Sequence, residues 1–325
     1  MDHPEPQLPL VADRARARAA GYSDAAISRR LAGDTWARLR RGWFSQASLE
    51  RDSRWRAEVL ATMRAHRRPL VLSHASAARA HGWPMPVGGW GPTSYTSPVP
   101  PVRRRAGSLV LVAGLEDGDI EYRGAVMVTS PARTVVDCAR RLPPHDALAI
   151  ADAALRSGVA LTAVSAALDQ AAGRPGVEGA RRVLRLANGR RESPFESWSA
   201  LAFDVHDLAP TLWQATVLDE EGRFLGRSDA WWKEGVIGEA DGRTKYRLVA
   251  LQRSGAVDAD GLAAAFDEER ARERGMRRTG ASIVRWAPRD VLQPVLTERL
   301  ARHLRREIRV AQTTGRFTGR VLELP

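Results

Sequence analysis

The sequence predicts two halves of different fold class: an α+β N-terminal half, and an α/β C-terminal domain with a small mixed sheet. Residues 8–44 read as two short helices followed by a basic, strand-like ribbon. Residues 194–311 read in the order helix, three strands, helix, strand, helix. The polar run at 188–191 is the clearest boundary between them. Together with the change of pattern near residue 66, this predicts three domains, over 1–66, 67–189 and 190–325.

The composition favours a polyanionic partner. The 325 residues include 50 Lys and Arg against 38 Asp and Glu, a formal charge of +12. Such an excess suits nucleic acid or an acidic membrane surface, although a coding bias towards arginine raises the charge as well. The single cysteine, Cys138, excludes an internal disulfide and a cysteine-based zinc cluster. No leader and no apolar stretch of about 18–20 residues is visible, so we expect a cytoplasmic protein with no membrane partner.

Helix-capping residues and helix-breaking residues predict the first helices and strands of the chain. Residues 8–20 read as a helix that ends at the Gly21-Tyr22 break. Ser23 is a good N-cap for a second helix over 24–32. The segment 35–44 then alternates as strand, turn, strand. Helix, turn, helix and ribbon, in this order, predict a winged helix-turn-helix.

This module supplies the candidate DNA contacts. Arginines on the second helix would enter the major groove, and arginines of the ribbon would meet phosphates. An arginine-rich solvated face is the alternative interpretation. The candidate residues are Ser28, Arg29, Arg30, Arg38, Arg40 and Arg41.

The middle of the chain, 67–189, predicts a small sheet followed by helices. A longer amphipathic helix over about 50–66 precedes it, and Ser73 caps a further helix. Proline and glycine dominate 84–107, which therefore predicts loops and short strands. The expected elements are strands over 109–112, 120–122 and 126–129, and two or three helices within 131–189.

The C-terminal elements carry a set of acidic residues. The expected elements are a helix over 194–207, three strands over 212–218, 224–232 and 235–241, a helix over 258–278, a strand over 281–286 and a helix over 288–311. Glu196 lies in the first turn of the first helix, and Asp229 lies in the second strand. Glu239 and Asp241 are two residues apart in the third strand, so they share one face. Clustered carboxylates repel one another unless a cation is present, and Mg²⁺ takes one or two of them with water and phosphate oxygens. Solvated turn carboxylates are the alternative.

Four blocks in this region resemble the endonuclease-like domain related to very-short-patch-repair nucleases, over about 190–290. They are Glu192-Ser193-Pro194-Phe195-Glu196-Ser197, Gly226-Arg227-Ser228-Asp229-Ala230-Trp231, Gly238-Glu239-Ala240-Asp241-Gly242-Arg243-Thr244-Lys245-Tyr246, and Glu269-Arg270-Ala271-Arg272-Glu273-Arg274 with Ile283-Val284-Arg285-Trp286 after it. The resemblance implies a PD-(D/E)xK fold in which Glu196, Asp229 and Glu239 are metal ligands. It also implies Mg²⁺ or Mn²⁺ as the cofactor.

One position departs from that class. The class pattern places Lys two residues after the second acid, where this chain has Asp241. Related domains often read Glu-x-Asp-Gly here, and Lys245 is a candidate to supply the missing positive charge. A domain that kept the fold and lost turnover is the other interpretation.

The N-terminal half resembles AbiEi-type antitoxins over about 10–160. The resemblance is carried by Ser23 to Ser45, by Ser73-His74-Ala75-Ser76-Ala77-Ala78, and by Thr129-Ser130-Pro131-Ala132-Arg133-Thr134-Val135-Val136-Asp137. It implies DNA binding and a toxin partner protein.

Two hypotheses follow. In the first, the chain binds DNA and its C-terminal domain is a Mg²⁺-dependent endonuclease. In the second, it is a non-catalytic transcriptional repressor or antitoxin whose nuclease-like domain is an interaction module. Neither needs a small-molecule cofactor.

Overall fold

The computed structural model describes residues 8–99, 108–241 and 259–323. The chain divides into two compact units, residues 1–137 and 138–325. The predicted boundary at 66/67 therefore lies within the first unit and the one at 189/190 within the second, and the three-domain division stays a prediction. Within the described residues, no helix is both long and apolar enough to cross a bilayer.

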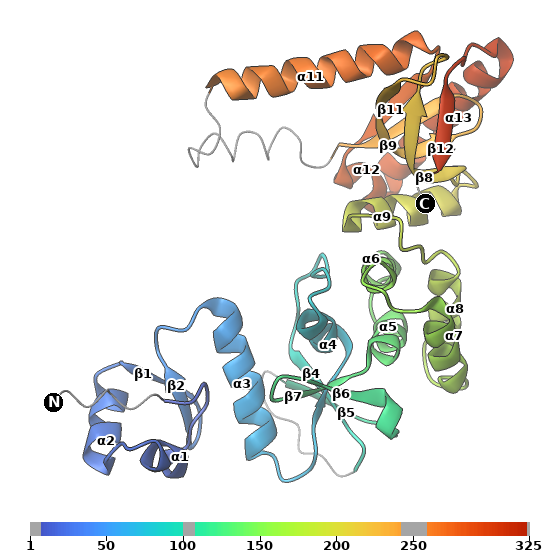
Figure 1. Ribbon diagram of the computed structural model, residues 1–325. Coiled ribbons are helices and arrows are strands. Elements are labelled where there is room, and N and C mark those ends of the chain that lie inside the picture. Colours follow the sequence, from blue (N-terminus) through green and yellow to red (C-terminus); the bar gives the residue numbers. More distant parts are fainter. Residues whose placement is uncertain (1–7, 100–107, 242–258, 324–325) are drawn as a thin grey trace. The chain divides into compact units, whose positions relative to one another are not determined.

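The first unit begins with two short helices and a two-stranded ribbon (Figure 1). These are α1 (Arg14–Ala19), α2 (Asp24–Ala32), β1 (Trp36–Arg40) and β2 (Trp43–Gln46). Ser23 caps α2 as predicted, since its side chain accepts a hydrogen bond from the Ala26 amide. The helix expected from residue 8 begins only at Arg14. Asp13 caps it there, and Ala12 pairs instead with Phe44 of the ribbon.

An aromatic cluster holds these elements together. The ring of Trp36 lies 4.9 Å from that of Tyr22, edge to face, and 5.2 Å from that of Phe44, stacked. Ile27 of α2 is fully buried in the same cluster. Aromatic pairs in these geometries add stability beyond the area they bury. The ribbon is thus fixed to both helices.

The rest of the first unit is a five-stranded mixed sheet with helices packed on it. The elements are α3 (Arg51–Ala65), β3 (Val71–Leu72), α4 (His74–His81), β4 (Thr93–Ser97), β5 (Ser108–Val112), β6 (Ile120–Arg123) and β7 (Val126–Thr129), and α5 (Pro131–Ala139) spans the boundary between the two units. The strand order is β5-β4-β3-β7-β6, with β3 parallel to β7 and β4 parallel to β5. Leu60, Leu72 and Val128 lie in its core, and Leu39 and Trp43 of the ribbon pack against that core.

The second unit opens with three helices: α6 (Pro144–Arg156), α7 (Leu161–Gln170) and α8 (Val177–Leu184). Asp152 of α6 joins them to the next helix. Its carboxylate, 1% exposed, accepts two hydrogen bonds from Arg191, at 2.6 and 2.9 Å, and one from Ser197, at 2.6 Å. The backbone amide of Asn188 donates a fourth, at 2.6 Å. A buried charge is tolerated only when it is paired in this way.

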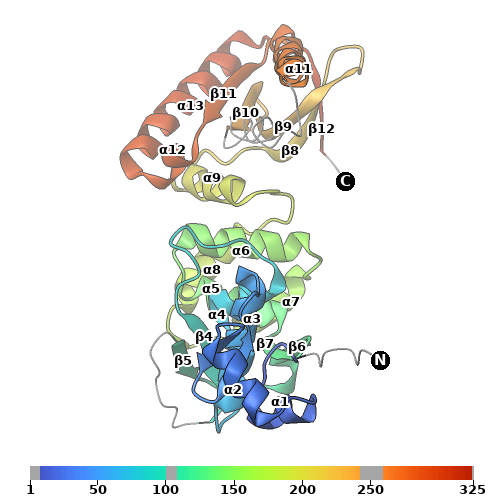
Figure 2. The ribbon, with the colours of Figure 1, turned by 90° about the vertical axis from the view of Figure 1, so that its left-hand side faces the viewer.

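A second mixed sheet of five strands completes the unit (Figures 1 and 2). Its elements are α9 (Pro194–Val205), β8 (Leu212–Leu218), β9 (Phe224–Trp232), β10 (Val236–Ala240), α11 (Ala259–Arg278), β11 (Ser282–Trp286), α12 (Pro288–Leu292), α13 (Pro294–Thr314) and β12 (Arg320–Glu323). The order is β11-β10-β9-β8-β12, antiparallel except for the parallel pair β10–β11. The mixed α/β class predicted for this region is therefore observed.

Two expectations for this region were incomplete. The final helix, predicted over 288–311, is interrupted at Gln293, because Pro294 has no amide hydrogen to continue α12 and instead opens α13. Strand β12, which pairs with β8, was not predicted.

The two faces of the sheet are packed differently. Phe203 of α9 lies 5.0–6.5 Å, between ring centroids, from Trp213, Trp232 and Trp286. Met276 of α11 lies instead in a cluster with Val217 and other apolar side chains. Gly226 of β9 has φ +156°, and a Cβ there would lie 2.6 Å from Met276. Close approach of α11 therefore requires glycine.

Candidate functional site

The N-terminus of α9 holds Glu196 in a fixed, largely buried position. The residue is 5% exposed. One carboxylate oxygen accepts a hydrogen bond from Ser193 Oγ at 2.7 Å, and the other accepts from the Glu192 amide at 3.0 Å. Ser193 in turn accepts from the Glu196 amide at 3.3 Å, so this is a reciprocal helix cap. Capping alone explains an acid at this position.

Gln214 connects Glu196 to the sheet. Its Nε2 donates to Glu196 Oε2 at 2.7 Å. The register of β8 and β9 places Gln214 opposite Asp229, between the pairs Trp213–Ala230 and Ala215–Ser228. Gln214 has φ +55°, which is unusual for a residue other than glycine in a strand. Such backbone outliers persist where neighbouring structure enforces them, often at functional sites.

Asp229 is the most perturbed carboxyl of this group. Burial is the main cause that raises its pKa from the usual 3.8 to about 6, and the charges of Glu196 and Glu239 raise it further. Hydrogen bonds from the Ala240 amide, at 2.8 Å, and from Gln214 act in the opposite direction. Asp229 is therefore close enough to Glu196 and to Glu239 to feel the charge of each. A bound cation would favour the ionised form of all three.

Glu239 faces two arginines. Arg272 of α11 donates to both of its carboxylate oxygens, at 3.0 and 2.9 Å. Arg285 of β11 is 3.9 Å from Glu239 Oε2. Both guanidinium groups are also paired with Glu269, and the pKa of Arg272 is raised chiefly by its hydrogen bonds to Glu269. Two permanent cations thus lie beside the acid site.

Of the two remaining candidate site residues, Asp241 and Lys245, the structure describes only Asp241. Asp241 follows β10, where its amide donates to the carbonyl of Trp286 at 2.9 Å and its side chain is exposed. Lys245, the predicted substitute for the class lysine, lies outside the described residues. Among described residues, the positive charges beside Glu239 come from Arg272 and Arg285.

The fit of a divalent ion can be tested on the polar atoms present. Among the described residues, no three His, Cys, Asp or Glu side chains lie close enough to share one metal ion. Mg²⁺ needs only one or two carboxylates, with other oxygens completing its shell. Gln214 Oε1 is buried and has no hydrogen-bond partner among the described residues. Asp229 and Gln214 Oε1 are thus oxygen ligands of the kind that Mg²⁺ or Mn²⁺ takes, whereas Glu239 is engaged by Arg272.

The predicted DNA contacts of the first unit are spread over α2 and the ribbon. Arg29, Arg38 and Arg41 are exposed, and the structure gives them no side-chain hydrogen bond or ion pair among the described residues. Arg40 is partly buried in β1. Ser28 instead accepts a hydrogen bond from Arg14 at 3.2 Å.

Arg30 differs from the other arginines of this module. Its guanidinium lies 5.1 Å from the Tyr22 ring centroid and 5.9 Å from that of Trp36. It therefore packs on the aromatic cluster, and a purely groove-reading role is less well supported for Arg30 than for Arg29.

Helix α13 carries a basic face that the sequence prediction missed. Arg302, Arg306 and Arg309 line a shallow groove of about 280 Å³ together with Thr313. Steps of three and four residues place them on one side of the helix. No described residue pairs with these three side chains, which are exposed. The spacing was visible in the sequence, and only the burial of the opposite face by Leu300 and Leu304 shows which side is free.

Comparisons with known proteins give a partial match. No sequence model of a protein family matches the chain. A segment of 106 residues, 32% of the chain, is 37% identical to the uncharacterized proteins MT2308 and Rv2248 of two strains of Mycobacterium tuberculosis. The match covers 39% of the length of each relative. These relatives therefore bring no activity, ligand or partner to the chain.

Proposed function

We propose that this chain binds DNA and that its C-terminal region is a PD-(D/E)xK-like endonuclease that hydrolyses phosphodiesters with Mg²⁺ or Mn²⁺. The observation that carries the proposal is the largely buried Asp229 of β9, which lies near Glu196 of α9 and near Glu239 of the adjacent strand. Burial is the main cause that raises the pKa of Asp229, and the charges of Glu196 and Glu239 raise it further. Carboxyl groups whose pKa is shifted by burial and by neighbouring acids are more common at functional sites than elsewhere.

The order of elements supports the same interpretation. Helix α9 precedes three antiparallel strands, and α11 then leads to β11, which is parallel to β10. The order of helices and strands is the one predicted from the sequence pattern of this region, over most of which the resemblance to very-short-patch-repair nucleases extends. The residues that this resemblance singles out, Glu196, Asp229 and Glu239, lie on α9, β9 and β10.

Within the site, each acid has a defined support. Ser193 and Gln214 hold Glu196, and the Ala240 amide holds Asp229. Asp229, with Glu196 or Glu239, would hold the ion. A bound Mg²⁺ or Mn²⁺ would polarise the scissile phosphate and supply a hydroxide at neutral pH. Arg272 and Arg285 would supply positive charge beside Glu239, in a chain that has Asp241 in place of the class lysine.

Two basic surfaces support DNA as the substrate. The ribbon and α2 offer Arg29, Arg38 and Arg41, and α13 offers Arg302, Arg306 and Arg309. Exposed arginines without acidic partners neutralise phosphates at little desolvation cost, and counterion release then drives binding.

One observation favours a second function, that of a non-catalytic repressor or antitoxin with a toxin partner. Arg272 occupies both oxygens of Glu239, as a structural ion pair would. A nuclease-like domain locked in this way would serve as an interaction module.

A cleavage assay separates the two functions. Plasmid and single-stranded DNA are incubated with the full chain, with and without Mg²⁺ or Mn²⁺, beside Asp229→Ala and Glu239→Ala. Asp169→Ala, which removes an exposed acid on α7, is the matched control. The nuclease proposal predicts nicking that needs the ion, survives in the control and is lost in both site variants. Equal DNA shifts without cleavage in all four proteins would support the second function.

A further inference from the structure

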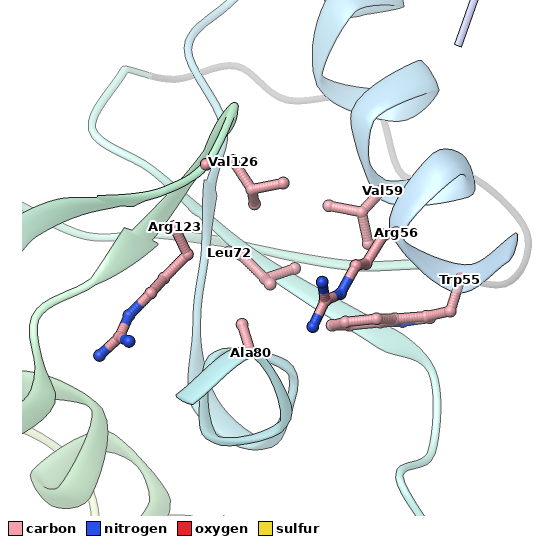
Figure 3. A pocket seen from close by; sticks show the side chains of 8 residues that line it. Trp55, Arg56, Val59, Leu72, Ala80, Arg123 and Val126 are labelled. Carbon is pink, nitrogen blue, oxygen red and sulfur yellow. The ribbon is translucent and has the colours of Figure 1, made fainter. Parts of the chain in front are cut away.

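The first unit contains a cavity of about 320 Å³ that no sequence motif indicated (Figure 3). Trp55 of α3 and Ala80 of α4 are the partly exposed apolar side chains of its lining, which also includes the buried Val59, Leu72 and Val126. Cavities of a few hundred Å³ with mostly apolar walls and a few polar groups are the usual form of small-molecule sites.

The aromatic wall is held in place from outside the cavity. The guanidinium of Arg79 lies 4.1 Å from the ring centroid of Trp55, a close cation–π contact. Arg79 is itself anchored by Asp52, at 2.6 Å. The indole is thus oriented in advance, which reduces the entropy lost when a ligand packs against it.

Two arginines give the cavity its charge. Arg56 on α3 and Arg123 at the end of β6 lie on opposite sides of Leu72 and Ala80, and the Arg56 guanidinium lies beside Trp55 (Figure 3). Arg123 is committed to Glu121 Oε1 at 2.8 Å and to His81 Nδ1 at 3.1 Å. Arg56 makes no hydrogen bond or ion pair with any described residue, although Asp52 lies near enough to feel its charge. The guanidinium at this mouth is available to an anion.

We propose that this cavity binds a small molecule with a flat apolar body and one carboxylate. The body would lie against Trp55 and Ala80, the partly exposed apolar side chains of the lining, and the carboxylate would accept hydrogen bonds from Arg56. The planar guanidinium fits a carboxylate through two parallel hydrogen bonds, which explains a preference for that group over a neutral one.

This site is independent of the acid cluster. Every lining residue belongs to the first unit, whereas Glu196, Asp229 and Glu239 belong to the second. The inference therefore does not rest on the proposed nuclease, and either can fail without the other.

The test uses a matched pair of probes, 2-naphthoate and its neutral isostere 2-naphthamide. Isothermal titration calorimetry measures both against the full chain and three variants. Arg56→Gln removes the unpartnered charge, and Ala80→Phe fills the cavity. Arg51→Gln removes an exposed arginine from the same helix without touching the lining. Far-UV circular dichroism checks that each variant is folded.

We expect saturable naphthoate binding in the millimolar range or tighter, as for a ligand of this size. The amide should bind about tenfold more weakly, since a hydrogen bond to a charged group is lost. Arg56→Gln should remove the preference for the carboxylate, and Arg51→Gln should keep it. Ala80→Phe should abolish binding of both probes. The proposal is overturned if naphthoate shows no saturable binding, or if wild type and Arg56→Gln bind naphthoate equally well. Neither outcome depends on whether Ala80→Phe folds.

Discussion

Arg272 donates hydrogen bonds to both carboxylate oxygens of Glu239, at 3.0 and 2.9 Å, across 33 positions of sequence. The same guanidinium is paired with Glu269 of its own helix, at 2.7 Å. A divalent ion that uses Glu239 must compete with this arginine for the same lone pairs. In the proposed metal site, the ion pair would therefore weaken metal binding that involves Glu239.

Removing the competitor should strengthen metal binding. Arg272→Gln leaves Glu239 with a neutral neighbour, so we expect Mn²⁺ to bind about tenfold more tightly, a change of about 1.4 kcal/mol. The midpoint of a Mn²⁺-dependent thermal shift measures it. Arg277→Gln is the control, because Arg277 lies on the same helix and is paired with Glu273 instead. Weaker Mn²⁺ binding in Arg272→Gln alone would show that the arginine supports the site.

Asp229 should make stability depend on pH. Its pKa is raised from 3.8 to about 6 in the folded chain, chiefly by burial. The unfolded chain therefore loses its proton first, and the stability this group contributes below pH 4 is lost as pH rises to about 6. Asp229→Asn should thus be more stable than wild type at pH 7, by about 2–3 kcal/mol, and equal to it near pH 4. Urea unfolding at both pH values tests this, and a constant difference between the proteins would contradict it.

Asp152 should be one of the most sensitive positions of the second unit. Asp152→Ala leaves the buried guanidinium of Arg191 without its partner, which typically costs about 3–5 kcal/mol. The free energy of unfolding, from urea denaturation, measures the loss. Asp169→Ala, an exposed acid on α7, should change it by less than about 0.5 kcal/mol. Similar values for the two variants would mean that Asp152 is solvated.

The salt dependence of DNA binding tests how many arginines of the two basic surfaces contact phosphates. Each arginine that neutralises a phosphate of duplex DNA contributes about 0.9 to the slope of log affinity against log salt. We expect Arg38→Gln and Arg41→Gln each to flatten that slope by about 0.9. Arg302→Gln and Arg306→Gln should do the same if α13 meets the same duplex. Arg141→Gln, an exposed arginine on the turn after α5, should leave the slope unchanged. A slope unaffected by all four substitutions would place the DNA elsewhere.

The sequence predicted what depends on local pattern. The order of the C-terminal elements, the Ser23 cap and the placement of Glu196, Asp229 and Glu239 on a helix and two strands follow from period, caps and turns. The structure adds what depends on contacts distant in sequence. In the sequence alone, Gln214 is an ordinary strand residue, and only the register of β8 and β9 shows that it lies opposite Asp229.

The helix and strand boundaries that the sequence prediction missed also depend on contacts between residues distant in sequence. The pairing of Ala12 with Phe44 shortens the first helix, and the pairing of β12 with β8 adds an edge strand. Both depend on tertiary contacts that outweigh the local pattern. The winged-helix and PD-(D/E)xK assignments stay predictions, supported by the order of elements and not yet tested.

Calorimetric titration of the full chain with Mn²⁺ at pH 7, beside Asp229→Asn, tests the central claim most directly. The account predicts one saturable site in the wild type, and its loss in Asp229→Asn although that variant stays folded. Identical titrations of the two proteins, or no binding to the wild type, would contradict it.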